Sequence, residues 1–266
     1  MLYCAHIVPV GTSLLANFTK SVEGFKVVEA LGVSGWDKLA PDDLGQNVIC
    51  SRFNELKSHL LEYVRVEGEK ASAELSSLLR AVKGLNCKPD LTYVILYATN
   101  TCNSRLAMNV LVEYLEELGF NAEDKVIRSI RSEDELDEAM AEVVEKVLDD
   151  AVELNHRGYK VCINTTPGFK VESIYLTIAA LIAGIDCIYY IHEAFKDIVY
   201  MPTPPLQLKE DYRKAITQLE KPIQRKEAEE KLGKTLLEEL KIRKMVEEEN
   251  NIIKAKQWIQ KITELT

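Results

Sequence analysis

The residues from Ile163 to Lys170 read Ile-Asn-Thr-Thr-Pro-Gly-Phe-Lys and carry the clearest chemical signal in the chain. They follow an apolar run, Tyr159 to Ile163, and open a predicted helix from about Val171 to Ala183. A helix N-terminus offers free backbone N–H groups and a favourable dipole to an anion such as phosphate. Two threonine hydroxyls add donors, Gly168 allows close approach to the backbone, and Lys170 adds a positive charge. We therefore expect a phosphate site here, although the same residues would also suit a plain tight turn.

A second turn of similar design lies near the start of the chain. The apolar residues from His6 to Val10 lead into Gly11-Thr12-Ser13, and a helical pattern follows. Threonine and serine are also ordinary N-cap residues, so this turn alone would be a weak signal. Two such turns on one α/β sheet predict a ligand with more than one phosphate.

A third turn, Thr99-Asn100-Thr101, follows the apolar run from Leu91 to Ala98. Arg105 falls in the first turn of the next predicted helix, where the dipole disfavours a cation unless an anion is near; a solvated surface arginine is the alternative. The candidate ligand-binding residues are Gly11, Thr12, Thr99, Asn100, Arg105, Asn164, Thr165, Thr166, Gly168 and Phe169.

Several other chemistries lack their sequence signals. The chain has no G-x-G-x-x-G after its first strand, no Walker A sequence and no His/Cys cluster with metal-ligand spacing, so we expect neither a cofactor nor a metal. Arg52 and His59 have the R-x6-H spacing of HEPN ribonucleases, which we assign to a solvated helix face. The net charge of -9 argues against a general nucleic-acid binder. Six scattered cysteines predict reduced core residues of a cytoplasmic protein.

Strand and helix patterns alternate along the first two hundred residues, which predicts a doubly wound, mostly parallel, Rossmann-like α/β sheet. The expected strands are Leu2–Val10, Leu91–Ala98, Lys125–Ile130, Tyr159–Ile163, Asp186–Ile191 and an edge strand at Asp197–Met201 that could run antiparallel. The expected helices are Ser13–Leu31, Val48–Lys83 in two pieces near Gly68, Asn103–Leu118, Glu133–Asn155 and Val171–Ala183. Because the carboxyl ends of parallel strands share one rim, we expect the three turns to lie together.

The proline-rich stretch Pro202 to Pro205 predicts a boundary between a domain at 1–201 and a tail at 206–266. In the tail, helices at Lys209–Leu219, Ile223–Leu232 and Lys234–Val246 and a strand at Ile252–Ile259 predict a winged-helix module. Its glutamate runs would repel phosphate. We therefore expect a protein-contact role rather than binding of duplex DNA. No segment approaches the roughly 20 apolar residues of a membrane span, so we expect no membrane partner.

The turn from Asn164 to Lys170, together with Gly11 to Ser13, resembles the CARF domains of CRISPR-associated proteins, which bind cyclic oligoadenylates. The resemblance covers roughly residues 1–200 and is strongest to the stand-alone CRISPR ring nucleases. These enzymes cleave cyclic tetra-adenylate and switch off type III CRISPR signalling. The resemblance implies that Ser13 and Lys170 are catalytic and that the tail is the winged helix appended to such domains.

The resemblance also implies the reaction. A ribose 2′-OH attacks its adjacent phosphorus without a metal and gives di-adenylate with a 2′,3′-cyclic phosphate. A homodimer would bind one ring on its two-fold axis. Two alternatives stay open: a CARF-type sensor whose winged helix regulates transcription, and a nucleotide-dependent enzyme unrelated to CRISPR.

Overall fold

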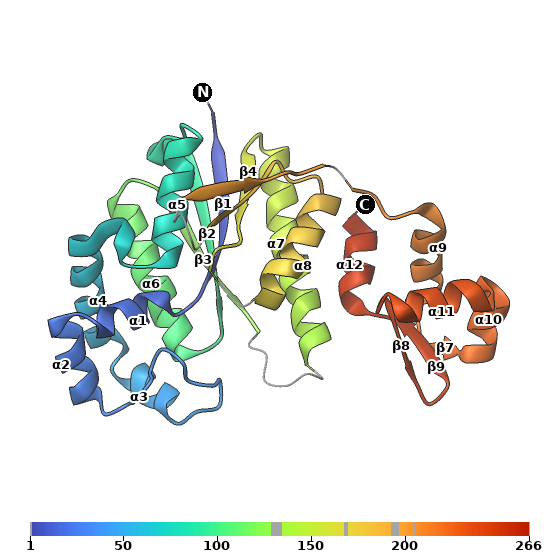
Figure 1. Ribbon diagram of the computed structural model, residues 1–266, viewed down its shortest axis with the longest axis horizontal. Helices are drawn as coiled ribbons and strands as arrows, with labels where there is room; N and C mark the ends of the chain where they lie inside the picture. Colours follow the sequence, from blue (N-terminus) through green and yellow to red (C-terminus); the bar gives the residue numbers. More distant parts are fainter. Residues whose placement is uncertain (1, 129–134, 168–169, 193–196, 205, 266) are drawn as a thin grey trace.

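The computed structural model describes residues 2–128, 135–167, 170–192, 197–204 and 206–265. Among them, six strands form one sheet in the order β3-β2-β1-β4-β5-β6 (Figure 1). The strands are β1 (Cys4–Val10), β2 (Thr92–Thr99), β3 (Asn121–Ile127), β4 (Lys160–Asn164), β5 (Cys187–Ile191) and β6 (Ile198–Met201). Strands β1 to β5 are parallel, and β6 pairs antiparallel with β5. The predicted mostly parallel α/β sheet is therefore confirmed, with its antiparallel edge strand.

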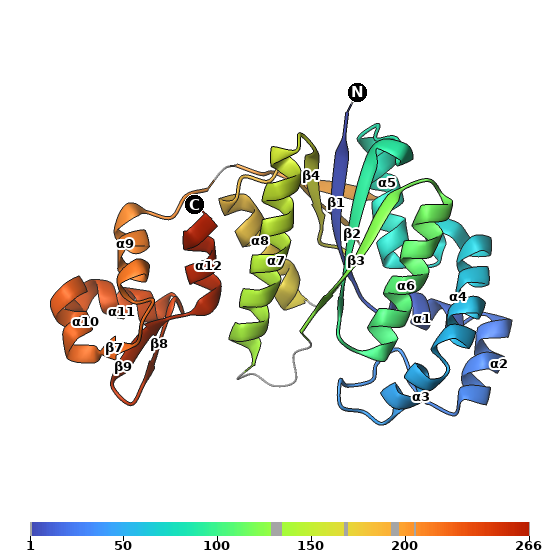
Figure 2. The same cartoon turned by 180° about the vertical axis from the view of Figure 1, so that it is seen from behind.

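Helices cover both faces of this sheet. One face carries α1 (Ser13–Thr19), α2 (Val22–Leu31), α3 (Gly45–Ser51), α4 (Phe53–Glu67), α5 (Ala73–Gly84) and α6 (Cys102–Glu117). The other carries α7 (Leu136–His156) and α8 (Lys170–Ile182), as Figure 2 shows from behind. Successive residues of β1 point to opposite faces of the sheet. Val8 packs against the first set of helices, and Ile7 packs against α7 and α8. Both faces of β1 are buried, which explains why its sequence is almost entirely apolar.

Three predicted elements of this domain differ from the structure. The helix expected in two pieces over Val48–Lys83 begins earlier, at Gly45, and forms three helices, α3, α4 and α5. The single helix expected over Ser13–Leu31 is two helices, because Ser21 caps α2 by accepting a hydrogen bond from Gly24 N at 2.9 Å. A Cβ on Gly24 would lie 1.8 Å from the carbonyl oxygen of Phe18, so only glycine fits this sharp bend. Strand β3 begins at Asn121, earlier than expected, because it is an edge strand whose exposed residues are polar.

The tail contains α9 (Glu210–Gln218), β7 (Ile223–Gln224), α10 (Arg225–Leu232), α11 (Lys234–Ile242), β8 (Val246–Glu249), β9 (Ile252–Ala255) and α12 (Gln257–Leu265). Within the described part of the tail, its strands form an antiparallel sheet in the order β7-β9-β8. The helix expected to reach Val246 ends at Ile242, and the strand expected to reach Ile259 ends at Ala255. Asn250 and Asn251 adopt positive φ angles of 50° and 61°, which form the hairpin turn and pair the glutamate-rich β8 with β9. The winged-helix assignment stays a prediction.

The tail packs against α7 and α8 of the first domain (Figure 1). Val144 and Leu148 of α7 share one hydrophobic cluster with buried tail residues such as Ile216. The rings of Trp258 and Tyr175 of α8 pack edge to face, with their centroids 5.3 Å apart. Ion pairs from Lys256 to Asp137 and from Lys261 to Glu145 flank this contact.

The cysteine prediction is wrong for four of the six residues. The structure joins Cys4 to Cys87 and Cys50 to Cys102, with Cα separations of 6.0 Å and 5.4 Å, which are ordinary for disulfides. The paired cysteines are 83 and 52 residues apart along the chain, respectively, so the sequence pattern does not indicate which cysteines pair. Cys162 and Cys187 are free and buried. Disulfides are rare in cytosolic proteins outside hyperthermophiles, and scattered cysteines alone therefore predict reduced thiols.

Candidate active site at the switch point of the sheet

The order of the sheet reverses between β1 and β4, which are neighbours although they are far apart along the chain. The strand after β1 in sequence, β2, lies on one side of it, and β4 lies on the other. Loops that leave β1 and β4 therefore run to opposite faces of the sheet, to α1 and α8. In open α/β sheets, ligands bind in the crevice at the carboxyl ends of the strands at such a point. The structure thus brings together the turns after Val10 and after Asn164.

The first turn binds an anion that the chain itself supplies. The backbone N–H of Gly11 donates to Glu74 Oε1 at 2.9 Å, and Ser13 Oγ donates to Glu74 Oε2 at 2.7 Å. Ser13 Oγ also accepts from the backbone N–H of Ala73 at 2.9 Å. Thr12 is the N-cap residue of α1, but its side chain makes no capping bond within the described chain. The groups that the sequence assigned to phosphate are thus bonded to a buried carboxylate that is 1% exposed.

Helix α5, which carries Glu74, also reaches the second turn. One helical turn further on, Ser77 Oγ accepts a hydrogen bond from Asn164 Nδ2 at 2.6 Å. Asn164 Oδ1 accepts from the backbone N–H of Thr166 at 3.0 Å, and the Asn164 side chain is fully buried. Asn164 therefore shapes its turn from within. The two turns are connected through a single helix.

The threonines of the second turn are bonded to the neighbouring strand β5. The N–H and the hydroxyl of Thr165 both donate to the carbonyl oxygen of Tyr189, at 2.9 Å and 3.3 Å. Thr166 Oγ1 accepts from the backbone N–H of Ile191 at 3.0 Å. Both threonines are half-buried, and these bonds fix the start of the loop against the sheet. Their role as ligand donors stays a prediction.

Lys170 is the first residue of α8, so the structure places its backbone at a helix N-terminus beside this turn. Gly168, Phe169 and the side chain of Lys170 lie outside the described parts of the chain. The predicted roles of these three residues therefore stay predictions.

The third turn follows β2, which is the neighbour of β1 on its other side. Thr99 Oγ1 donates to Ser104 Oγ at 3.1 Å, and the backbone N–H of Asn100 donates to the carbonyl oxygen of Ile127 at 2.9 Å. The side chains of Asn100 and Arg105 are exposed at this end of the sheet. All three turns therefore follow neighbouring parallel strands.

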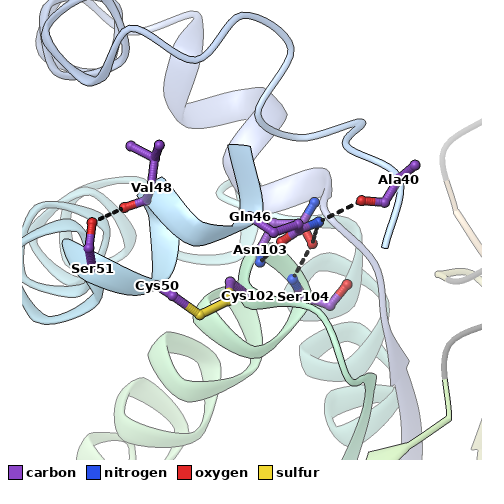
Figure 3. Close-up of a disulfide and its surroundings, with 8 residues drawn as sticks. All are labelled: Ala40, Gln46, Val48, Cys50, Ser51, Cys102, Asn103 and Ser104. Atoms are coloured by element: carbon purple, nitrogen blue, oxygen red, sulfur yellow. Dashed lines mark hydrogen bonds between the residues drawn. A yellow bond between two sulfur atoms is a disulfide. The ribbon is translucent and has the colours of Figure 1, made fainter. Parts of the chain in front are cut away.

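The beginning of α6, just after the third turn, is tied to α3 by a covalent bond and by a pair of amide side chains (Figure 3). The disulfide joins Cys50 of α3 to Cys102. Gln46 Nε2 donates to Asn103 Oδ1 at 3.2 Å, and the backbone N–H of Asn103 donates to Gln46 Oε1 at 3.1 Å. The segment that presents Arg105 is thus anchored on a second helix.

Other candidate groups lie away from the rim or in ion pairs. Among the described residues, no three His, Cys, Asp or Glu side chains are grouped so that they could hold a metal ion. Arg52 pairs with Glu55 at 2.5 Å and His59 with Glu23 at 2.9 Å, as expected for an exposed helix face.

His6 is buried in the middle of β1, where burial lowers its pKa from 6.5 to about 3, so it is neutral near neutral pH. No helix of the described chain is long and apolar enough to cross a bilayer.

Sequence reasoning missed Glu74 and Ser77. Ser72-Ala73-Glu74 looks like any helix start, with a capping serine and an acidic residue in the first turn. Glu74 is 61 residues from Ser13, and Ser77 is 87 residues from Asn164. Nothing in the sequence pattern indicates these two contacts.

This chain is similar to a protein of solved structure and to a protein family. The crystal structure of protein VC1899 from Vibrio cholerae is similar over 61% of this chain, at 10% sequence identity and a TM-score of 0.34. The match spans 55% of that protein's length. The family model of the CRISPR-associated protein Cas_APE2256 matches residues 69–204, just over half of the chain. The matched stretch includes α5, the third turn and the turn that ends at Lys170. The chain belongs to the CRISPR-associated Cas_APE2256 family.

Proposed function

We propose that this protein is a ring nuclease that binds cyclic tetra-adenylate and cleaves it without a metal ion. The products would be di-adenylates with 2′,3′-cyclic phosphates, and cleavage would switch off type III CRISPR signalling. One observation carries the proposal: in a chain of a CRISPR-associated family, the Gly11–Ser13 and Asn164–Lys170 turns flank the switch point of the sheet. Helices α1 and α8 begin at the two turns.

The proposed chemistry needs position and charge. The 2′-oxygen must lie in line with the leaving 5′-oxygen, and the phosphoryl oxygens need positive charge as the transition state forms. Lys170 supplies that charge at the N-terminus of α8, while Ser13 contacts the reacting nucleotide. One well-placed donor of this kind accounts for a rate factor on the order of 10² to 10³.

We also propose that the protein is a homodimer that binds one ring on its two-fold axis. Four equivalent phosphodiesters allow the ring to share that axis, so each turn would meet the ring twice. Ile174 and Ile178, one turn apart on α8, are 58% and 43% exposed. They follow Lys170 on the same helix, so a dimer contact along α8 would bring two copies of the Asn164–Lys170 turn to one ring.

The tail's charges favour a protein-contact role. Lys241 on α11 pairs with Glu248 at 2.5 Å, and Arg225 pairs with Glu238 and Glu248 at 2.9 Å and 3.1 Å. These cations would have to leave their carboxylate partners before they could contact a DNA backbone.

The test is to incubate the purified protein with cyclic tetra-adenylate and to separate the products by chromatography. We expect a linear tetra-adenylate intermediate and then di-adenylate with a cyclic phosphate end. Lys170→Ala should slow single-turnover cleavage sharply, and Ser13→Ala to a similar or smaller extent. Lys26→Ala, which removes the same charge from exposed α2, is the matched control. A wild-type protein that binds the ring and leaves it intact would point to the sensor alternative.

A further inference from the structure

We propose that Glu74 is a positioning residue that acts through Ser13: it orients the Ser13 hydroxyl and takes the proton that Ser13 receives from the attacking 2′-OH. This role rests on the ring-cleaving function proposed above. It supplies a proton acceptor for the attacking 2′-OH.

The hydrogen bonds of Ser13 set what its oxygen can offer a ligand. Its own hydrogen points to Glu74 Oε2 at 2.7 Å, and one lone pair accepts from Ala73 N at 2.9 Å. A hydroxyl has one hydrogen and two lone pairs, so these two bonds leave a lone pair for the ligand. In this arrangement Ser13 accepts a hydrogen bond from a ligand, and a ribose 2′-OH is a donor of that kind. Donation from Ser13 to a phosphate would require its bond to Glu74 to break.

The burial of Ser13 and Glu74 sets the direction of this proton relay, which runs from the ligand through Ser13 to Glu74. Glu74 is 1% exposed, so a bound ring cannot touch its carboxylate. Ser13 is only half-buried, and its hydroxyl contacts that carboxylate. Glu74 Oε1 is held by the N–H of Gly11 at 2.9 Å, which fixes the carboxylate while Oε2 faces Ser13. A proton can therefore pass from the ligand to Glu74 through Ser13.

The same carboxylate determines where the phosphate binds. A phosphate at the N–H of Gly11 would place a second anion beside Glu74, where little water screens their repulsion. The reacting phosphate should therefore lie at the other turn, at the N-terminus of α8. The first turn would then hold the sugar and the second turn the phosphate.

The proposed reaction exchanges one bond to phosphorus for another and moves two protons. The 2′-OH gives its proton to Ser13 Oγ while Ser13 gives its own to Glu74 Oε2, which becomes a neutral carboxylic acid. The 2′-oxygen forms a bond to phosphorus, and the bond from phosphorus to the 5′-oxygen breaks. The 5′-oxygen takes a proton from water, and Glu74 later returns its proton to solvent through Ser13. The net change is a transesterification that consumes no water.

The experiment compares Glu74→Gln with Glu74→Asp in single-turnover cleavage of cyclic tetra-adenylate and in ring-binding affinity. Glutamine keeps the shape of the side chain but cannot take a proton; aspartate is shorter but keeps the carboxylate. We expect E74Q to slow cleavage on the order of 10²-fold, as for loss of a general base, with little change in affinity. E74D should cleave faster than E74Q. Glu69→Gln, at an exposed carboxylate paired with Arg80, is the charge-matched control.

A purely structural role for Glu74 predicts the opposite order, with the isosteric E74Q more active than E74D. That order, or an E74Q rate within about threefold of the wild-type rate, would overturn the relay while leaving the ring nuclease proposal in place. Because Glu74 acts through Ser13, E74Q should add nothing to the loss caused by Ser13→Ala, and additive losses would also refute it. If E74Q does not fold, a folded E74D no faster than Ser13→Ala would refute it equally. A wild-type protein that does not cleave the ring removes the function and the relay together.

Discussion

Removal of the disulfide between Cys50 and Cys102 should destabilise the protein without unfolding it. The two residues are 52 positions apart, and loop-closure entropy for a link of that length corresponds to about 4 kcal/mol. For a chain of 266 residues, this loss would lower the melting temperature by about 7 °C. Cys50 is exposed, whereas Cys4 and Cys87 are 0% and 8% exposed. Mild reductant should therefore open the Cys50 link first.

The assay is guanidinium unfolding of the oxidised wild type and of the double variant Cys50→Ala/Cys102→Ala, each with and without mild reductant. The variant should be less stable by about 4 kcal/mol, and mild reductant should bring the wild type to the same stability. Reductant should change the variant little until the buried Cys4–Cys87 link opens. The variant keeps that link and so controls for general effects of the reductant.

Thiol counting tests whether the two disulfides are formed in the native protein. Alkylation in denaturant without reductant should modify Cys162 and Cys187 and leave the other four cysteines unmodified. Modification of all six would show that the sulfurs are not bonded in the native protein. If the oxidised wild type and the double variant are equally stable, the disulfide does not contribute the expected stabilisation of about 4 kcal/mol.

Four further predictions concern pH, metal, stoichiometry and the tail. His6 has a folded pKa of about 3 against an ordinary 6.5, so the unfolded chain takes up a proton first as the pH falls. Its stabilising contribution should be present above pH 6.5 and lost towards pH 3, at up to about 1.4 kcal/mol per pH unit, and His6→Leu should remove that slope from urea unfolding curves. Ring cleavage should persist in EDTA; loss on chelation with recovery on adding Mg²⁺ would contradict the metal-free mechanism. Calorimetry with Lys170→Ala should give one ring per two chains, and one ring per chain would exclude a shared site. Duplex DNA should bind weakly at physiological salt, and a tight sequence-specific complex modulated by the ring would favour the regulator.

Elements buried on both faces were the predictable part of the fold. Strands β1, β2 and β4 are mostly apolar because helices cover both sides of the sheet there, so their positions follow from the sequence. The start of β3 does not follow from the sequence, because β3 is an edge strand and has exposed polar residues such as Asn121. The break between α1 and α2 depends on the contact of Gly24 with Phe18, which no helical periodicity reveals.

The candidate site divides in the same way. The turns at Gly11 and Asn164 were visible because glycine, proline and hydroxyl residues follow apolar strands. Their meeting at one rim follows from the strand order, which the alternation of elements only suggests. The contact of Glu74 with Ser13 depends on how α5 lies across the ends of the strands, and so only the folded chain shows it. The disulfides are hidden for the same reason.

The hydrophobic cluster shared by α7 and the tail has a consequence for how the chain folds. Val144, Leu148 and Ala179 of the first domain are almost completely buried in a cluster that tail residues complete. Helix α12 makes that contact with α7, so the outer layer of the first domain stays uncovered until residues 257–265 have been synthesised. Cleavage after β6 would expose an apolar strip on both fragments. The two domains should therefore unfold in one cooperative transition, and the proline-rich connection should not mark a boundary between independently stable parts.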